Sequence, residues 1–276
     1  MSLVIRGLNL FLTVLVLVIN GLSVFFKLGK GQAVDEHLRA IGLEGGAVFI
    51  WLLIYLLMFS FSIYQMLPFT YNYKYINQGI SPFFSAQAIA NIGWVFARVY
   101  QADNKQWMDF IFVYLMFIIL GLMYASTMAS VDTKCQADDH PYLNYFFGRL
   151  WLSIYFAWTA GAVCTSSFGK FHPPSFIAYL FAASLFVLIA IVAIVLLFAN
   201  MDIAFGLTVV WMAAWIAYSN CQPQFSNSMT LPLFAISIVF GSIVLFFSIC
   251  FLVRIISRTI QRESIRRDTQ TLAGEA

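Results

Sequence analysis

Three polar side chains in one apolar stretch are spaced to lie on the same face of a helix. Gln87, Asn91 and Trp94 follow one another at steps of four and three residues, so two amides and an indole would form one stripe. An unpaired amide is costly in hydrocarbon, so the stripe should face other helices or a cavity. Two interpretations stay open: interhelical hydrogen bonds that lock a bundle, or polar groups that orient a ligand.

Large aromatic side chains accompany this stripe. Tryptophan gathers at membrane interfaces, which accounts for Trp107 and Trp151, but Trp51, Trp94 and Trp158 fall deeper in apolar stretches. Flat aromatic walls with few hydrogen-bonding groups suit a large planar or ring-fused apolar ligand. The candidate chemistry is therefore the binding of such a ligand.

Residue types that would support catalysis or metal binding are sparse. His37, His140 and His172 fall in predicted loops, and none has a second ligand at metal-site spacing. The sequence has no Cys-x-x-Cys motif, nucleophile elbow or phosphate-binding glycine loop, and no apolar stretch has paired carboxylates at its middle. We expect a protein that is not an enzyme, with no metal site and no nucleic-acid partner.

The elements that must position these side chains are membrane helices. Of the 276 residues 62% are hydrophobic and 10% are charged, against about 25% charged in an average soluble domain. A helix needs about 20 apolar residues to cross the hydrocarbon core. Eight stretches qualify, at about Leu8–Phe26, Gly46–Leu67, Pro82–Tyr100, Asp109–Thr127, Tyr145–Phe168, Pro174–Ala199, Ile203–Asn220 and Leu231–Ile256. The fold class is therefore predicted to be all-α, a polytopic transmembrane helix bundle with about eight spans.

The junctions between these stretches carry further expectations. One helix across the sixth and seventh stretches would be about 70 Å long, so Asn200, Met201 and Asp202 must form a tight turn. Cys164 and Cys221 are predicted at the same membrane face. A disulfide between them and two separate thiols are both compatible with the sequence.

Lys and Arg decide the orientation, because they gather on the cytoplasmic side. An even number of spans puts both termini on one side, and nine basic residues on that side face six on the other. The nine are Arg6, Lys74, Lys134, Arg149, Arg254, Arg258, Arg262, Arg266 and Arg267. Both termini are thus predicted on the cytoplasm-like (matrix-like) side, and mitochondrial and bacterial inner membranes are the candidate locations.

Four of the tail arginines, Arg254, Arg258, Arg262 and Arg266, stand four residues apart, on one helical face. They are expected to reach anionic lipid headgroups. A stop-transfer flank that fixes topology and a docking surface for a soluble partner both fit this pattern.

The third stretch resembles the Gln-Leu-x-Leu-Asn-x-x-Trp signature of the translocator protein family, also called tryptophan-rich sensory proteins. Gly45 to Tyr55 is similar to the family's Gly-x-x-Phe-x-x-Trp-x-x-x-Tyr run, and Arg149 to Ala162 is similar to its fifth helix. The resemblance covers about Leu8–Phe168, the family's five-helix unit. Leu43-Glu44-Gly45-Gly46 stands where the family has a proline-rich, tryptophan-bearing segment.

This resemblance implies a five-helix bundle at residues 1–168, followed by three additional membrane helices at 169–257 and a basic tail at 258–276. It also implies an inward cavity for tetrapyrroles or sterol-like lipids, with a sensory or transport-related role. The residues implied to line the cavity are Trp51, Tyr55, Gln87, Asn91, Trp94, Trp158 and Ala162. A bound porphyrin, sterol or lipid is the implied ligand, and no cofactor is required.

A second function remains open. The changed segment at Leu43–Gly46 and the basic tail favour a structural accessory subunit of a larger membrane complex, in which the cavity is vestigial. A homodimer is a further possible assembly. The two functions predict different interiors: a site that takes up a flat ligand, or a bundle whose outer faces bind other subunits.

Overall fold

The computed structural model describes residues 2–25, 49–99, 106–130, 143–168, 176–221 and 231–274. In this part of the chain the structure is helical and contains no strand. The α-helices are α1 (Leu3–Phe25), α3 (Phe49–Tyr64), α4 (Ser81–Val99), α5 (Gln106–Ser130), α7 (Leu150–Phe168), α8 (Phe176–Asn200), α9 (Ile203–Cys221) and α10 (Leu231–Gly274). Each of these helices overlaps one of the eight predicted stretches, which confirms the all-α bundle.

Membrane spanning follows from helix length and composition. Four described helices have segments long and apolar enough to cross a bilayer: Leu3–Ser23, Trp107–Ser130, Phe176–Asn200 and Leu233–Ser257. The helices α3 and α9 are apolar but shorter. Helices suit this environment because they satisfy their backbone hydrogen bonds internally, where no water is present to do so. The outward side chains of these segments are largely apolar, as lipid contact requires; Ile177, for example, is 73% exposed.

The chain turns sharply between α8 and α9, as the length argument predicted. Met201 has a φ of 53°, in the left-handed region, which lets the chain reverse within two residues. Asp202 then caps α9, because its Oδ1 accepts a hydrogen bond from the backbone N–H of Phe205 at 3.0 Å.

Two segments before long helices are irregularly wound. A 3-10 helix, η2 (Pro68–Asn72), and a π-helix, η3 (Tyr75–Ile80), lead into α4, and a second π-helix, η4 (Asn144–Arg149), leads into α7. The two π-helices meet through Asn144, whose Oδ1 accepts hydrogen bonds from Tyr75 at 3.1 Å and from Tyr64 of α3 at 2.5 Å. These windings were not predicted: residues 68–81 lie between the second and third predicted stretches, and residues 145–149 lie at the start of the fifth.

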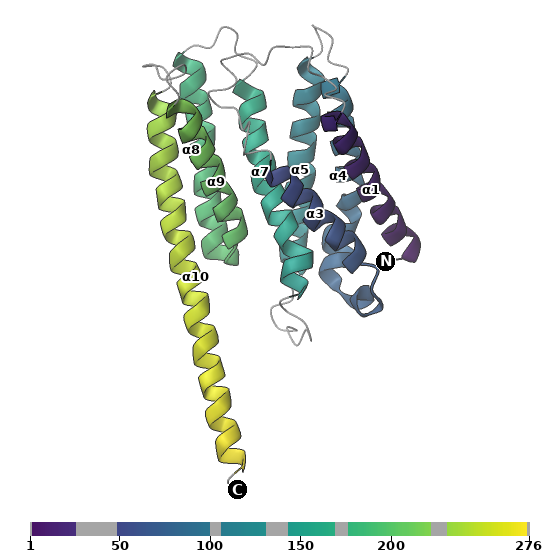
Figure 1. Cartoon of the computed structure of the whole chain (residues 1–276), viewed down its shortest axis with the longest axis vertical. Coiled ribbons are helices and arrows are strands. Elements are labelled where there is room, and N and C mark those ends of the chain that lie inside the picture. Colours follow the sequence, from purple (N-terminus) through teal and green to yellow (C-terminus); the bar gives the residue numbers. More distant parts are fainter. Residues whose placement is uncertain are drawn as a thin grey trace.

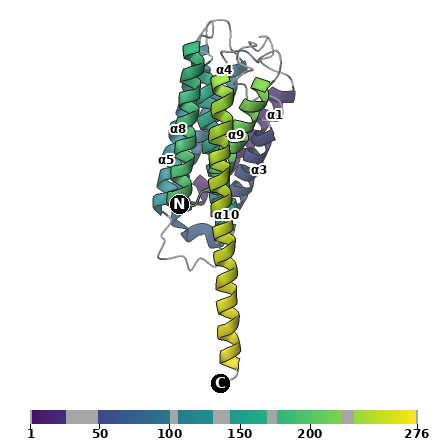
Figure 2. The ribbon, with the colours of Figure 1, turned by 90° about the vertical axis from the view of Figure 1, so that its left-hand side faces the viewer.

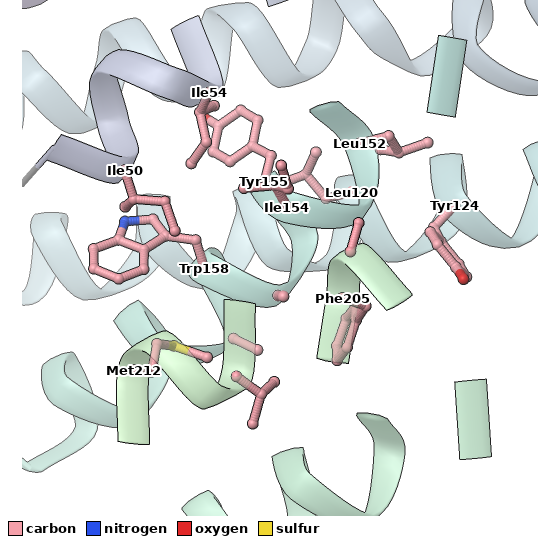
Figure 3. Packing of buried hydrophobic residues seen from close by; sticks show 14 of the residues in the cluster. Ile50, Ile54, Leu120, Tyr124, Leu152, Ile154, Tyr155, Trp158, Phe205 and Met212 are labelled. Carbon is pink, nitrogen blue, oxygen red and sulfur yellow. The ribbon is translucent and has the colours of Figure 1, made fainter. Parts of the chain in front are cut away.

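The helix α7 lies at the centre of the bundle (Figure 1). On one side are α1, α3, α4 and α5, and on the other are α8, α9 and α10. Figure 3 shows the continuous core that results: α7 places Ile154, Tyr155 and Trp158 between two isoleucines of α3 and two side chains of α9, Phe205 and Met212. The three helices after α7 therefore share one hydrophobic core with the first five.

The last helix runs far past the rest of the molecule. It has 44 residues and is about 66 Å long, roughly twice the hydrocarbon thickness. Figures 1 and 2 show its C-terminal part projecting alone from the end of the bundle at which α1 begins. The tail predicted to leave the bilayer as a helix is thus helical in its backbone.

Some of the predictions concern residues that the structure does not describe. The three histidines and the segment Leu43–Gly46 lie outside the described residues. Cys164 is a buried free thiol whose Sγ lies 3.4 Å from the backbone oxygen of Ala182, whereas the side chain of Cys221 is outside the described part of the chain.

Candidate functional site

Trp51 is the centre of an aromatic cluster in the interior of the bundle. Its ring stacks on Trp94 of α4, with centroids 5.5 Å apart and planes 23° apart, and on Tyr55 one turn along α3 at 5.5 Å. The edges of two α7 rings meet it at near-right angles, Tyr155 at 5.8 Å and Trp158 at 6.2 Å. Three helices thus bring five rings together, including four of the predicted site residues.

A chain of hydrogen bonds connects this cluster to α1. The Tyr55 hydroxyl donates to Oδ1 of Asn20 at 2.8 Å, and Nδ2 of Asn20 donates to Oδ1 of Asn91 at 2.9 Å. Asn91 is fully buried, and each of these groups would be costly to bury unpaired. The predicted Gln-Asn-Trp stripe therefore faces the bundle interior, as expected.

The hydroxyl of Tyr155 joins the two amides of the stripe. It accepts hydrogen bonds from Nε2 of Gln87 and from Nδ2 of Asn91, each at 2.7 Å, and lies 3.7 Å from the Met116 sulfur. Gln87, Asn91 and Tyr155 are all 0% exposed. These side chains therefore form hydrogen bonds between α4 and α7, as the first of the two interpretations predicted.

Two polar atoms of the same stripe lack a hydrogen-bond partner among the described residues. They are the side-chain oxygen of Gln87, an acceptor, and the indole nitrogen of Trp94, a donor. Turning the Gln87 amide over would pair its oxygen with Tyr155 and leave its nitrogen unpaired instead. A buried unpaired polar group costs about 1–3 kcal/mol. Hydrogen bonds that stabilise the bundle therefore do not explain why these two polar atoms are buried without partners in the described part of the chain.

Ala162 stands at the edge of this arrangement. It lies one turn beyond Trp158 on α7 and packs, together with Trp94, against a small second group formed by Ala90, Val113 and Met116. Trp94 links the two groups, because its ring also stacks on Trp51. The structure thus brings all seven predicted residues into one region of the bundle.

The predicted site omitted two residues, Asn20 and Tyr155, that hold its hydrogen bonds together. Tyr155 stands within the fifth-helix run that resembles the translocator family, three residues before Trp158, so helical periodicity could have indicated it. Asn20 carried the signal of an amide inside an apolar stretch.

Among the described residues, one charged side chain contacts the rim of this cluster. Arg98 lies in the last turn of α4, and its side chain is exposed. Its guanidinium carbon is 5.1 Å from the centroid of the Trp94 ring, a cation–π distance. The cluster itself consists of indole, phenol and amide groups, which can stack and hydrogen-bond but offer no nucleophile or acid–base pair. Among the described residues no group of three His, Cys, Asp or Glu could hold a metal.

A second buried polar site lies toward the opposite end of α1. Arg6 is only 1% exposed, and its guanidinium donates to the backbone oxygen of Gln65, to Oγ1 and the backbone oxygen of Thr70 at 2.8 and 3.3 Å, and to Oδ1 of Asn77 at 3.0 Å. The Tyr71 ring covers it at 4.5 Å. In the sequence, Arg6 counted only toward the orientation; in the structure its buried side chain acts as a clamp that holds residues 65–77 against α1.

A third buried polar group joins the two sides of the bundle. The Oδ2 atom of Asp202 accepts hydrogen bonds from Tyr124 of α5 at 2.6 Å and from Ser153 of α7 at 2.7 Å. Asp202 is 2% exposed. Its three donors come from α5, α7 and α9, so this carboxylate links α9 to the helices before it.

Comparison with known proteins agrees with this architecture. Neither the curated proteins nor the solved structures gave a match to the chain. The family model described as "TSPO-like protein" matches residues 6–251, from the first turn of α1 into α10. The match includes the five-helix unit on which the sequence resemblance rested and also α8, α9 and most of the membrane part of α10. Because the family model covers most of the chain and the helices are those of a membrane bundle, this chain is an integral membrane protein of the TSPO-like protein family.

Proposed function

We propose that the chain is a membrane receptor or carrier that binds a planar apolar ligand, a tetrapyrrole or a sterol-like lipid, at the cluster around Trp51. The observation that carries this proposal is the pair of unpartnered buried atoms, Gln87 Oε1 and Trp94 Nε1, beside stacked aromatic rings. Unpartnered polar groups in a dry interior are costly, and a ligand with hydrogen-bonding groups would satisfy them. Nothing in the cluster supports covalent chemistry, so the proposed role is binding and not catalysis.

Trp51 takes the position that a flat ligand would need. Its ring already covers Trp94 and meets Tyr155 and Trp158. A ligand would therefore displace Trp51 or insert between Trp51 and Trp94, and in either case it would contact Trp94. Because Trp51 is in the first turn of α3, its displacement would disturb few helical hydrogen bonds.

Titration with a porphyrin, followed by quenching of tryptophan fluorescence, tests this function on the purified full-length protein. We expect saturable quenching by the unmodified protein. Trp94→Phe keeps a ring but removes the unpartnered N–H, so it should weaken binding about fivefold while leaving thermal stability nearly unchanged. Trp107→Phe is the matched control, since Trp107 is 64% exposed. Absence of saturable quenching in the unmodified protein would refute the proposal.

A second candidate function is favoured by the shape of α10. A lone polar helix of a few turns is marginally stable by itself in water. The part of α10 after Ser257 extends about 25 Å beyond the span and lies apart from the bundle in both views (Figures 1 and 2). Such a helix suits attachment to anionic headgroups or to another subunit, which is the accessory-subunit role.

Truncation after Ser257 distinguishes these roles. If α10 holds a partner, native gels after gentle detergent extraction should show a large complex for the full chain and a smaller species for the truncated chain. Binding of porphyrin should be the same in both, because the cluster lies on α1, α3, α4 and α7. Identical migration of the full chain and the truncated chain would contradict the accessory role.

A further inference from the structure

Arg98 places a positive charge at the rim of the aromatic cluster. It is exposed, in the last turn of α4, about one helical turn after Trp94 along the chain. Its guanidinium rests 5.1 Å from the centroid of the Trp94 ring. A guanidinium above an indole ring keeps its N–H donors available at its edges, so the contact orients Arg98 without using up its hydrogen bonds.

The Trp94 ring connects this cation to the interior. Trp94 stacks on Trp51, and Trp51 stacks on Tyr55, each pair with centroids 5.5 Å apart. Among the side chains shown to contact these rings and the Gln87–Asn91 amides, Arg98 is the charged one. The described site therefore combines neutral stacking and hydrogen-bonding groups inside with one positive charge at its edge.

We propose that Arg98 is a specificity-determining residue that selects ligands with a carboxylate attached to a planar ring system. The ring would stack at Trp94 and Trp51, and the carboxylate would pair with the guanidinium, whose fork of donors matches the two carboxylate oxygens. This inference rests on the proposed binding function and narrows it: acidic tetrapyrroles are selected over neutral sterol-like lipids.

A pair of ligands that differ only in charge tests this inference. Protoporphyrin IX carries two carboxylates, and its dimethyl ester carries none. The full-length protein in detergent is titrated with each, and the ratio of the two affinities is compared between variants, since partition of each ligand into micelles cancels in that comparison. We expect Arg98→Gln to reduce the preference for the diacid about fivefold while leaving affinity for the ester unchanged.

Three further variants sharpen the result. Arg98→Lys should retain part of the preference, and Arg98→Glu should reduce it below the Gln level because like charges repel. Lys74→Gln is the matched control, an exposed cation next to η3 toward the other end of α4. It should leave the ratio unchanged.

The possible failures are distinct. An unchanged diacid-to-ester ratio in Arg98→Gln, with both ligands still bound, would overturn the role of Arg98 and leave the binding function intact. A loss of affinity for both ligands alike would also overturn it, since that indicates a general structural effect. Absence of saturable binding of either ligand to the unmodified protein would overturn the inference together with the proposed function.

Discussion

At the scale of single residues, the hydroxyl group of Tyr155 holds the interior of the site together. It is the shared acceptor for the amides of Gln87 and Asn91, and Asn91 continues the chain of hydrogen bonds to Asn20 on α1. One hydroxyl on α7 thereby fixes two side chains on α4. Because the surroundings are dry, loss of such an acceptor leaves its donors unsatisfied.

Replacement of Tyr155 with Phe should lower stability. The ring and its contact with Trp51 are kept, but two buried amide donors lose their acceptor, at an expected cost of about 1–2 kcal/mol. Thermal unfolding in detergent measures this as a lower Tm. Tyr114→Phe is the control, since its hydroxyl makes a part-buried hydrogen bond to Ser167 at 2.7 Å. A Tyr155→Phe protein no less stable than this control would contradict the role given to the hydroxyl.

At the scale of elements, the buried Arg6 side chain holds an irregular segment against α1. Its acceptors on Gln65, Thr70 and Asn77 are 59 to 71 residues away in sequence. The 3-10 helix at Pro68–Asn72 has five residues, and backbone hydrogen bonds at its ends join Thr70 N to the oxygen of Leu67 at 3.0 Å and Tyr73 N to the oxygen of Thr70 at 3.1 Å. The Arg6 guanidinium thus attaches η2 and the start of η3 to α1 by hydrogen bonds.

Substitution of Arg6 with Gln should loosen that segment. The shorter neutral side chain cannot reach the same acceptors, so we expect amide hydrogen exchange in 68–77 to become at least about tenfold faster, equivalent to about 1.4 kcal/mol of local stability. Lys74→Gln, within the same segment but exposed, should leave exchange unchanged. Equal exchange rates in Arg6→Gln and the unmodified protein would rule out the clamp.

The elements themselves were largely predictable from sequence. Uninterrupted apolar runs located the long helices, and the length limit for one span located the turn at Asn200–Asp202. The windings at η2, η3 and η4 were not predictable. Their side chains find partners such as Asn144 and Arg6 only after distant helices have packed together, and local periodicity carries no information about such pairs.

At the scale of the whole molecule, one carboxylate joins the last three helices to the first five. Asp202 caps α9 and accepts hydrogen bonds from Tyr124 and Ser153. Beside it, Phe205 packs edge-on against Phe156 of α7, with ring centroids 5.6 Å apart. The family match also continues through this junction. The eight helices are therefore one packed body.

Removal of the Asp202 carboxylate should weaken this junction. Asp202→Ala leaves two hydroxyl donors and the first turn of α9 without their acceptor, and we expect a loss of about 2–4 kcal/mol in the free energy of unfolding. Asp202→Asn keeps one acceptor oxygen and should lose about half as much. Thermal unfolding measures both, with Ser184→Ala on the exposed side of α8 as the control. Equal stability of all three variants would contradict the junction.

The close packing of α9 against α10 leads to a second prediction for the whole molecule. A Cβ atom at Gly241 would lie 2.6 Å from the Cβ of Ala213, nearer than carbon atoms can approach. Gly241→Ala should therefore cost about 1–3 kcal/mol by forcing the helices apart. Gly7→Ala is the matched control, because a Cβ there meets no atom within 4 Å, and it should stabilise α1 by up to about 1 kcal/mol. Equal melting temperatures for the two variants would contradict this packing.

The sequence by itself determined that the protein lies in a lipid bilayer, where its helices fall, and which residues of the site share one face of a helix. Scarce charge and long apolar runs allow only membrane helices, and residues at steps of four and three share a face whatever surrounds them. Only the tertiary structure decided what that face meets: Tyr155 and Asn20 as hydrogen-bond partners, Trp51 as the central ring, Arg98 at the rim and Arg6 as a buried clamp. The physical reason is that helical periodicity is a local property, whereas the pairing of a buried polar group depends on which distant helix packs against it.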